Sequence, residues 1–376
     1  MPYYSKLSGR SNDSLWKTIL QRFDFLLLGL ILVTVFYGII VIYGATYSVA
    51  NLSHFAHRQI LWVLVGLTAF MIILIPDYRW FRHGAWPLYL ITVLALLFLL
   101  VAGREIKGAR SWFSFGPYRL QPSEFAKITV VLCLAHYLAG RERTPEKIRD
   151  IIIPTLIASI PAGLIFIQPD LGTASLFFPL LLVMLYASGT TFRLILMIIL
   201  ISAWLGLSAY PFLKPYQKAR LKVFVNPEHD PTWQGYNIRQ AEISLGSGGP
   251  VGKGWKQGTQ TRLRFLPERH TDFIYSSLGE QFGFAGCLAL IILYSSILFR
   301  AARPAWLARS HFARLTTVGL VSCLMIHLFF NIGMTLRLLP VTGLPLPLFS
   351  YGGSFLLTNF IIFGIIQNIN MRRHHY

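Results

Sequence analysis

The sequence predicts an all-α polytopic membrane protein, on three observations. Hydrophobic residues make up 54% of the chain and charged residues 13%, whereas a soluble domain carries roughly 25% charged residues. The apolar residues gather in runs of about 18 or more, which is enough to cross roughly 30 Å of hydrocarbon as a helix. These runs are continuous rather than alternating, which favours helices over the strands of a closed barrel.

About ten transmembrane helices are expected, in a single transmembrane domain over residues 1–376. Only Gln168-Pro169-Asp170 and Gly189 separate the three successive runs in the middle of the chain. The expected spans lie near 23–46, 58–76, 84–102, 122–139, 151–167, 170–188, 191–211, 277–299, 313–335 and 345–369.

The Lys and Arg residues of the short loops indicate the orientation of the chain. They are concentrated on the side that carries both ends, so both termini are expected in the cytoplasm. Segment 212–276 then forms a long extracytoplasmic loop, in which 236–245 is expected to be a short helix. The loop is basic, but long loops are translocated largely regardless of their charge.

The net charge of +19 would suggest nucleic acid binding in a soluble protein. Here the charge lies in loops, so it indicates membrane topology and contact with anionic membrane lipid, and no nucleic acid partner is expected. Cys133, Cys287 and Cys323 all lie in apolar segments without a disulfide or zinc pattern, so they are expected to be small core residues.

Ionisable residues at the outer ends of the spans indicate a functional site. Glu124 and Lys127 begin the fourth span, Asp170 begins the sixth, and Asp272 precedes the eighth. Each also has a simpler explanation: a local i, i+3 ion pair, a helix N-terminal acid, and a residue near a helix cap. Since all four lie at one depth on one side, we expect them to converge at the outer face.

Two glycine clusters lie on the same side. Residues 246–254 faintly resemble a phosphate-binding P-loop, but the spacing is wrong, so they form either a tight turn or a backbone contact with a phosphorylated lipid. Residues 350–354 are expected in the outer half of the last span, where small residues let helices pack closely. His327 and Asn331 share a helix face and are interpreted as interhelical hydrogen-bonding residues rather than metal ligands.

Four stretches together resemble a known family, the SEDS proteins of shape, elongation, division and sporulation. They are 121–127 (QPSEFAK), 168–174 (QPDLGTA), 267–274 (PERHTDFI) and 339–354 (LPVTGLPLPLFSYGGS). The form of the last two is similar to the elongation (RodA-like) members rather than the division (FtsW-like) members. Arg110 departs from the family pattern, because a serine separates it from Trp112, and Arg337 stands where the family usually has a small residue.

The resemblance implies a peptidoglycan glycosyltransferase of the bacterial cytoplasmic (inner) membrane that polymerises lipid II, a disaccharide-peptide on undecaprenyl diphosphate. A class B penicillin-binding protein, a transpeptidase, is the implied partner. Carried over by motif, Asp272 is the catalytic residue, and Glu124, Lys127 and Asp170 are polar residues of the substrate cavity. The further substrate-binding candidates are Arg110, Arg269, His270, Lys253, Ser350 and Gly352.

The chemistry of polymerisation requires a base for the acceptor hydroxyl and positive charge for the leaving diphosphate. Asp272 is the expected base. The positive charge has two open sources: a divalent cation (Mg²⁺ or Mn²⁺) held by carboxylates, or basic side chains. No other cofactor is expected. The basic candidates are Lys127, Lys253, Arg262, Arg264 and Arg269.

Two other functions remain open. Charged residues within spans also mark transport pathways, so a lipid II flippase is one alternative. Transporters, however, place their sites near the midplane of the membrane, whereas these residues lie near its outer surface. A non-catalytic scaffold for another wall enzyme is the second alternative.

Overall fold

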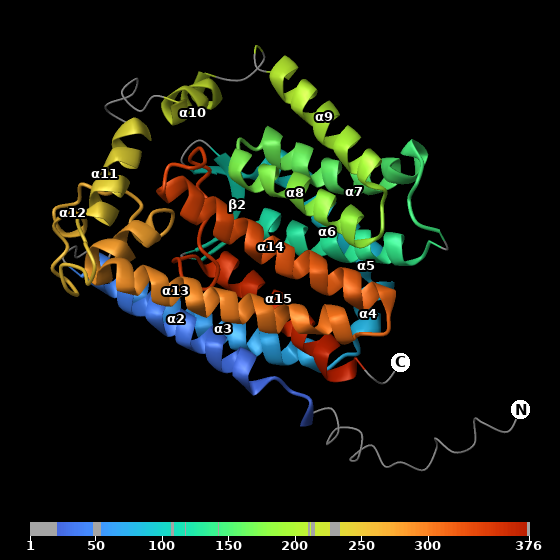
Figure 1. Ribbon diagram of the computed structural model, residues 1–376, viewed down its shortest axis with the longest axis horizontal. Helices are drawn as coiled ribbons and strands as arrows, with labels where there is room; N and C mark the ends of the chain where they lie inside the picture. The colour runs from blue at the N-terminus through green and yellow to red at the C-terminus, as the bar shows by residue number, and fades with distance from the viewer. Residues whose placement is uncertain are drawn as a thin grey trace, which may run out of the picture.

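The computed structural model describes residues 21–47, 54–106, 109–116, 118–141, 143–209, 211, 215–225 and 234–373, and these are mostly helical (Figure 1). The elements in chain order are α2 (Phe25–Thr46), α3 (His54–Leu74), α4 (Tyr78–His83), α5 (Ala85–Ala102), β1 (Arg104–Ile106), β2 (Ala109–Phe115), β3 (Tyr118–Leu120), α6 (Pro122–Ala139), α7 (Ile148–Ile167), α8 (Leu171–Ala187), α9 (Phe192–Ala209), α10 (Pro215–Val225), α11 (Gln234–Gly246), α12 (Thr259–Arg262), α13 (Ile274–Leu307), α14 (His311–Thr335) and α15 (Gly353–Arg372).

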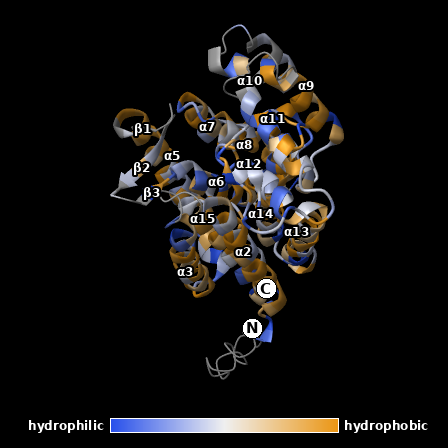
Figure 2. Cartoon of the chain, turned by 90° about the vertical axis from the view of Figure 1, so that its left-hand side faces the viewer, coloured by the Kyte–Doolittle hydropathy of each residue, from blue (hydrophilic) through white to orange (hydrophobic). Residues whose placement is uncertain are grey.

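Each of the ten expected spans coincides with a helix: α2, α3, α5, α6, α7, α8, α9, α13, α14 and α15. In the described part of the chain, α2, α3, α7, α13, α14 and α15 are long and apolar enough to cross a membrane, and shorter apolar helices lie at Ala85–Val101, Leu171–Ala187 and Phe192–Gly206. Figure 2 shows hydrophobic residues along helices such as α2 and α13. The chain is therefore a multi-pass membrane protein.

Helix α6 lies at the centre of the bundle. It packs against α5, α7, α8 and α14, and none of its residues is exposed. Glu124 and Lys127 lie in its first turns, so the helix that carries these charges is enclosed by other helices rather than by lipid. Charged side chains in a membrane protein are expected to face the bundle interior in this way.

A small antiparallel sheet, which the sequence analysis did not predict, leads into α6. Its strand order is β1-β2-β3, and Arg119 of β3 pairs with Ser114 of β2. The strands are too short and too polar to stand out beside the apolar spans, and their pairing depends on a turn between β2 and β3.

The last span begins later than expected, at Gly353 rather than near residue 345. Pro345 and Pro347 have no N–H to donate in a helix, and Leu348 has a left-handed φ of 63°. Residues 350–352 therefore form a turn that precedes α15, and only Gly353 and Ser354 of the glycine cluster lie in the helix. We call residues 350–354 the glycine turn.

Residues 246–254 form a tight turn against α13, which confirms the simpler interpretation of this segment. The amides of Lys253 and Gly254 donate to the carbonyls of Glu280 and Gln281 at 2.9 and 3.1 Å, so both are already paired within the protein. Helix α13 kinks at Gly283, where φ is 63°. The expected helix at 236–245 is present as α11.

Candidate functional site

A cavity of about 580 Å³ lies where five helices begin. It is lined by residues near the N-terminal ends of α3, α6, α8, α13 and α15, together with β2, β3 and the segment between α14 and α15. Glu124, Asp170 and Asp272 all line it. Three of the four ionisable residues that were expected to converge thus share one pocket.

The fourth residue, Lys127, lies behind Glu124 and does not line the pocket. Its Nζ is 2.7 Å from Glu124 Oε2 and 2.7 Å from His327 Nε2, and it is only 2% exposed. Because an ammonium can only donate, His327 accepts this bond through a neutral ring. The interhelical role expected for His327 is confirmed, and the ion pair fixes the Glu124 carboxylate at the pocket wall.

Asp170 has two roles in the structure. Its Oδ1 accepts from the Thr173 amide at 3.1 Å, so it caps α8, as the simpler interpretation predicted. Its Oδ2 accepts from Gln121 Nε2 at 3.1 Å, which links the starts of α8 and α6. Both bonds orient the carboxylate where it lines the pocket.

Asp272 lies just before α13, whose N-cap is Phe273. Asn331 of α14 donates to the carbonyl oxygens of Asp272 and Leu344, at 2.9 and 2.7 Å. A Cβ added to Gly343, which has a φ of 74°, would lie 3.4 Å from Asp272 Oδ2. The backbone of Asp272 is thus fixed by α14, and its carboxylate lies over a glycine.

The glycine turn joins this segment to α15. The Ser350 hydroxyl donates to the Thr271 carbonyl at 2.7 Å, and the Tyr351 amide donates to the His270 carbonyl at 2.9 Å. The ring of His270 stacks on Phe55 of α3, with centroids 4.6 Å apart. One turn thus holds both residues that precede Asp272.

Of the other expected substrate-binding residues, two line the pocket and three do not. His270 and Gly352 line the pocket, while Ser350 is buried and bonded within the glycine turn. Lys253 and Arg269 lie outside the lining. Lys253 is 3.2 Å from Glu280 Oε1. Arg269 is 4% exposed, and burial, together with the charge of Arg264, lowers its pKa.

Arg110 and Arg337, the two arginines that depart from the family pattern, have different outcomes in the structure. The backbone of Arg110 lies in β2, but its side chain is outside the described residues. Arg337 has an Nη1 3.9 Å from Glu242 Oε1 and does not line the pocket.

The sequence analysis missed Glu280, a fully buried carboxylate in α13. It accepts from the amides of Gln260 and Thr261 at 2.7 and 3.1 Å, as well as from Lys253. It therefore fastens α12 and the turn at 246–254 onto α13. A carboxylate within an expected span was the signal that could have found it.

Arg58 and Arg119 were also missed as site residues. Both line the pocket, whereas the sequence analysis did not single them out. The signal that could have found Arg119 is its place two residues before the 121–127 motif.

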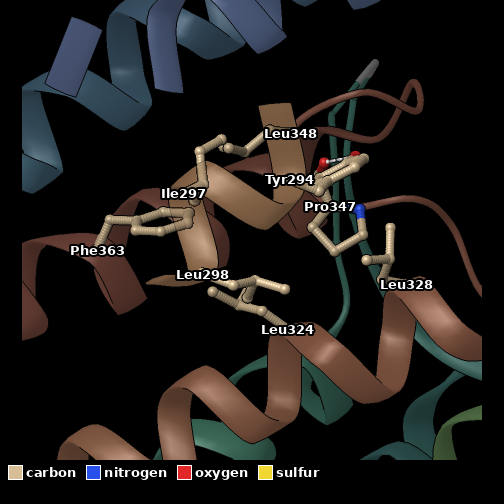
Figure 3. A pocket seen from close by; sticks show the side chains of 8 residues that line it. All are labelled: Tyr294, Ile297, Leu298, Leu324, Leu328, Pro347, Leu348 and Phe363. Atoms are coloured by element: carbon tan, nitrogen blue, oxygen red, sulfur yellow. Dashed lines mark hydrogen bonds between the residues drawn. The ribbon is translucent and has the colours of Figure 1, made fainter. Parts of the chain in front are cut away.

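A second hollow lies among α13, α14, α15 and the segment before α15 (Figure 3). It has a volume of about 10 Å³, which is too small for more than one water molecule. Its walls are apolar apart from Tyr294, whose hydroxyl donates to the Pro347 carbonyl at 2.5 Å. This hollow is a packing defect rather than a ligand site.

Among the described residues, no group of three or more His, Cys, Asp or Glu side chains is arranged to hold a metal ion. Of the pocket carboxylates, Glu124 lies in α6, Asp170 is the N-cap of α8, and Asp272 precedes α13.

Comparison with known proteins gives consistent results. A family model of cell cycle proteins, covering FtsW, RodA and SpoVE, matches residues 24–375. Peptidoglycan glycosyltransferase MrdB of Escherichia coli (strain K12) is 38% identical over 317 residues, which are 84% of this chain and 85% of MrdB. Peptidoglycan glycosyltransferase RodA of Treponema pallidum (strain Nichols) is 31% identical, with 93% of this chain and 98% of that protein covered.

Two solved structures are similar over nearly the whole chain. One, described as "Structural coordination of polymerization and crosslinking by a peptidoglycan synthase complex", has a TM-score of 0.82 at 31% identity, with 94% of this chain and 99% of the other covered. The rod shape determining protein RodA of Thermus thermophilus has a TM-score of 0.71 at 28% identity, with 94% and 98% covered.

Proposed function

This chain belongs to the FtsW, RodA and SpoVE family of cell cycle proteins, and from this premise we propose that it polymerises lipid II into glycan strands during cell elongation. It is a peptidoglycan glycosyltransferase of the RodA-like kind. The observation that carries the proposal is the convergence of Glu124, Asp170 and Asp272 in one pocket.

Asp272 is the proposed general base. Polymerisation forms a bond between an acceptor sugar hydroxyl and the anomeric carbon of the growing chain, and it breaks the bond from that carbon to the lipid diphosphate. The carboxylate of Asp272 takes the hydroxyl proton, and the diphosphate leaves with the bonding electron pair. Two observations support this role: Asp272 lines the pocket, and its backbone carbonyl accepts a hydrogen bond from Asn331.

Glu124 and Asp170 are proposed to bind substrate around this base, and Lys127 is proposed to position Glu124. The carboxylates of Glu124 and Asp170 can accept hydrogen bonds from sugar hydroxyls, and both are oriented by protein contacts. Lys127 acts through Glu124, because it holds that carboxylate and does not reach the pocket surface.

A divalent cation, Mg²⁺ or Mn²⁺, is a further proposed component. Mg²⁺ is usually held by one or two carboxylates together with substrate phosphates, and Asp170 and Asp272 fit that requirement because both line the pocket. When bound, such an ion would neutralise charge on the leaving diphosphate.

We also propose that the single transmembrane domain crosses the bacterial cytoplasmic (inner) membrane ten times, with both termini in the cytoplasm and 212–276 as an extracytoplasmic loop. In that orientation the even-numbered spans begin outside. The pocket supports this arrangement, because the five helices that begin at it are the second, fourth, sixth, eighth and tenth expected spans: α3, α6, α8, α13 and α15.

A class B penicillin-binding protein, a transpeptidase, is the proposed partner. The similar solved structure is described as a peptidoglycan synthase complex that coordinates polymerization and crosslinking. Crosslinking is a different reaction from glycosyl transfer, so the proposed partner would supply a second active site.

The test is polymerisation by the purified chain in detergent. Lipid II is supplied and glycan polymer is measured by gel electrophoresis. We expect polymer. A flippase would give no polymer, because detergent leaves no compartments between which lipid could be moved. A non-catalytic scaffold would also give no polymer. The absence of polymer would therefore refute the proposal.

A further inference from the structure

A group of arginines lies at the end of the bundle opposite the pocket. Helices α13 and α15 begin at the pocket. Arg300 and Arg303 lie near the other end of α13, and Arg373 follows the last residue of α15. Arg22 lies just before α2, whose start is at the same end of the bundle as the end of α15 (Figure 1). We call Arg22, Arg303 and Arg373 the arginine cluster.

Hydrogen bonds hold two members of the cluster together, although they lie at opposite ends of the chain. The side-chain amide of Asn370 donates to the Arg22 carbonyl at 3.3 Å, and Asn370 Oδ1 accepts from Arg373 Nη1. Asn370 thus joins the segment before α2 to the end of α15.

Asp24 lies beside the cluster, but its carboxylate is already paired. It accepts from Arg300 Nε and Nη2 at 3.1 and 2.7 Å, and from the Leu27 amide at 3.0 Å as the N-cap of α2. Arg303 lies one turn after Arg300, so it is on nearly the same side of α13. The one carboxylate that joins α2 to α13 is therefore matched by Arg300, and the charge of the cluster is in excess.

The guanidinium groups of the cluster act on one another. Burial lowers the pKa of Arg373, the positive charges of Arg303 and Arg22 lower it further, and the charge of Asp24 raises it. Nη1 of Arg22 is buried and, in the part of the chain that the structure describes, has no hydrogen-bond partner. A buried donor without an acceptor is costly, so this end of the bundle suits an anionic group that carries acceptor oxygens.

Exposed aromatic residues place the cluster at the membrane surface. Phe299, Arg303 and Trp306 are spaced i, i+4 and i+7 on α13, so they share one face. The two aromatic side chains are 81% and 85% exposed, and Phe25 in the first turn of α2 is 71% exposed. Tryptophan is enriched at the level of the lipid headgroups. Arg303 is thus presented to lipid between two apolar rings, which favours a lipid over an acidic protein from solution.

From these observations we propose that the arginine cluster binds the headgroup of an anionic phospholipid. A guanidinium presents a planar fork of donors that matches phosphate oxygens, and basic pockets between transmembrane helices are suited to anionic headgroups. A zwitterionic phospholipid carries the same phosphate, but the cluster repels its ammonium group. In the orientation proposed above, the lipid belongs to the cytoplasmic leaflet, on the side opposite the substrate pocket.

The experiment measures phospholipid binding to the purified full chain in detergent by native mass spectrometry. Phosphatidylglycerol and phosphatidylethanolamine with the same acyl chains are compared, and the readout is the ratio of their affinities. The variants are Arg22→Gln, Arg303→Gln, the double variant and Arg303→Lys. Arg193→Gln is the matched control, because Arg193 is an exposed arginine in the first turn of α9, which packs against α8. Inorganic phosphate and a polyglutamate peptide are added as competitors.

We expect the unmodified chain to prefer phosphatidylglycerol, and each Gln variant to lower the affinity ratio about tenfold, as for the loss of one hydrogen bond to a charged group. The double variant should lower it further. Arg303→Lys should fall in between, because lysine keeps the charge without the fork. Both substitutions should leave the fold intact, since Asn370 contacts the backbone carbonyl of Arg22 and the Arg303 side chain is exposed. Arg193→Gln should leave the ratio unchanged.

An unchanged ratio in the double variant would overturn the proposal. An equal fall in Arg193→Gln would also overturn it, because the total charge of the chain would then attract the lipid. Displacement of phosphatidylglycerol by inorganic phosphate would indicate a site for free anions, and displacement by the peptide would indicate an acidic protein partner, so either result would contradict the proposal. Because the ratio compares two lipids on one sample, partial unfolding lowers both affinities and does not imitate loss of the site. The measurement requires no catalysis, so its result is independent of the proposed function.

Discussion

The hydroxyl of Ser350 donates to the carbonyl oxygen of Thr271 at 2.7 Å, and this bond joins the glycine turn to the residue that precedes Asp272. Ser350 also accepts from the Leu346 amide at 2.8 Å. The same turn contacts α3 through Gln59 and β3 through Arg119. The position of the proposed base thus depends on a turn that lies about 80 residues away in the chain.

Replacing Ser350 with alanine should lower both stability and activity. The substitution leaves the buried Leu346 amide and Thr271 carbonyl without partners, which costs about 1–3 kcal/mol. Thermal unfolding in detergent and the polymerisation rate of the folded fraction measure the two effects. Ser296→Ala is the matched control, because that exposed hydroxyl bonds only to Ile292 of its own helix. Similar losses in both variants would contradict the prediction.

Asp272→Asn should abolish polymerisation with little effect on folding. General-base catalysis contributes about 10²–10⁴-fold to a rate, and the amide cannot take the proton. The backbone bond from Asn331 is unaffected because it goes to the carbonyl of residue 272. Glycan polymer and thermal unfolding are measured together. An active variant would show that another group is the base.

The buried pair of Glu124 and Lys127 should respond differently to single and double substitution. Lys127→Met leaves a buried carboxylate unpaired, which costs about 3–5 kcal/mol. Adding Glu124→Gln should recover part of that stability, since both charges are then absent. Polymerisation should stay about 10²-fold low in the double variant, because the substrate-facing carboxylate is lost. Recovery of activity along with stability would mean that the pair has only a structural role.

The positions of the spans and of the polar residues could be predicted from the sequence, because a helix that crosses lipid must be long and apolar and charged residues within it are rare. Long apolar runs stand out, and so do Glu124, Asp170 and Asp272 beside them. Arg58 could not be assigned to the site, since its place depends on Gln59 contacting Ser350, 291 residues away. The start of α15 was placed too early because apolar Leu346, Leu348 and Phe349 continue the run, although Pro345 and Pro347 prevent a helix there.

Glu280→Gln should loosen the outer segment while the bundle stays folded. An amide keeps some of the hydrogen bonds from Gln260 and Thr261 but loses the charge that pairs with Lys253. Hydrogen exchange of residues 246–264 should become faster, and exchange of α6 should not change. Glu242→Gln is the control, since that side chain is 40% exposed and 3.9 Å from Arg337. Slow exchange in both variants would show that Glu280 does not fasten the segment.

Gly343→Ala should reduce activity more than stability. With a φ of 74°, alanine at this position costs about 1–2 kcal/mol, and its Cβ would lie 3.4 Å from Asp272 Oδ2. The added methyl group restricts the side on which an acceptor hydroxyl can reach the carboxylate, so the polymerisation rate should fall in molecules that are still folded. Gly29→Ala is the control, because a Cβ there meets nothing within 4 Å, and alanine favours the interior of α2. Equal polymerisation rates in the two folded variants would indicate that substrate reaches Asp272 from a side other than that of Gly343.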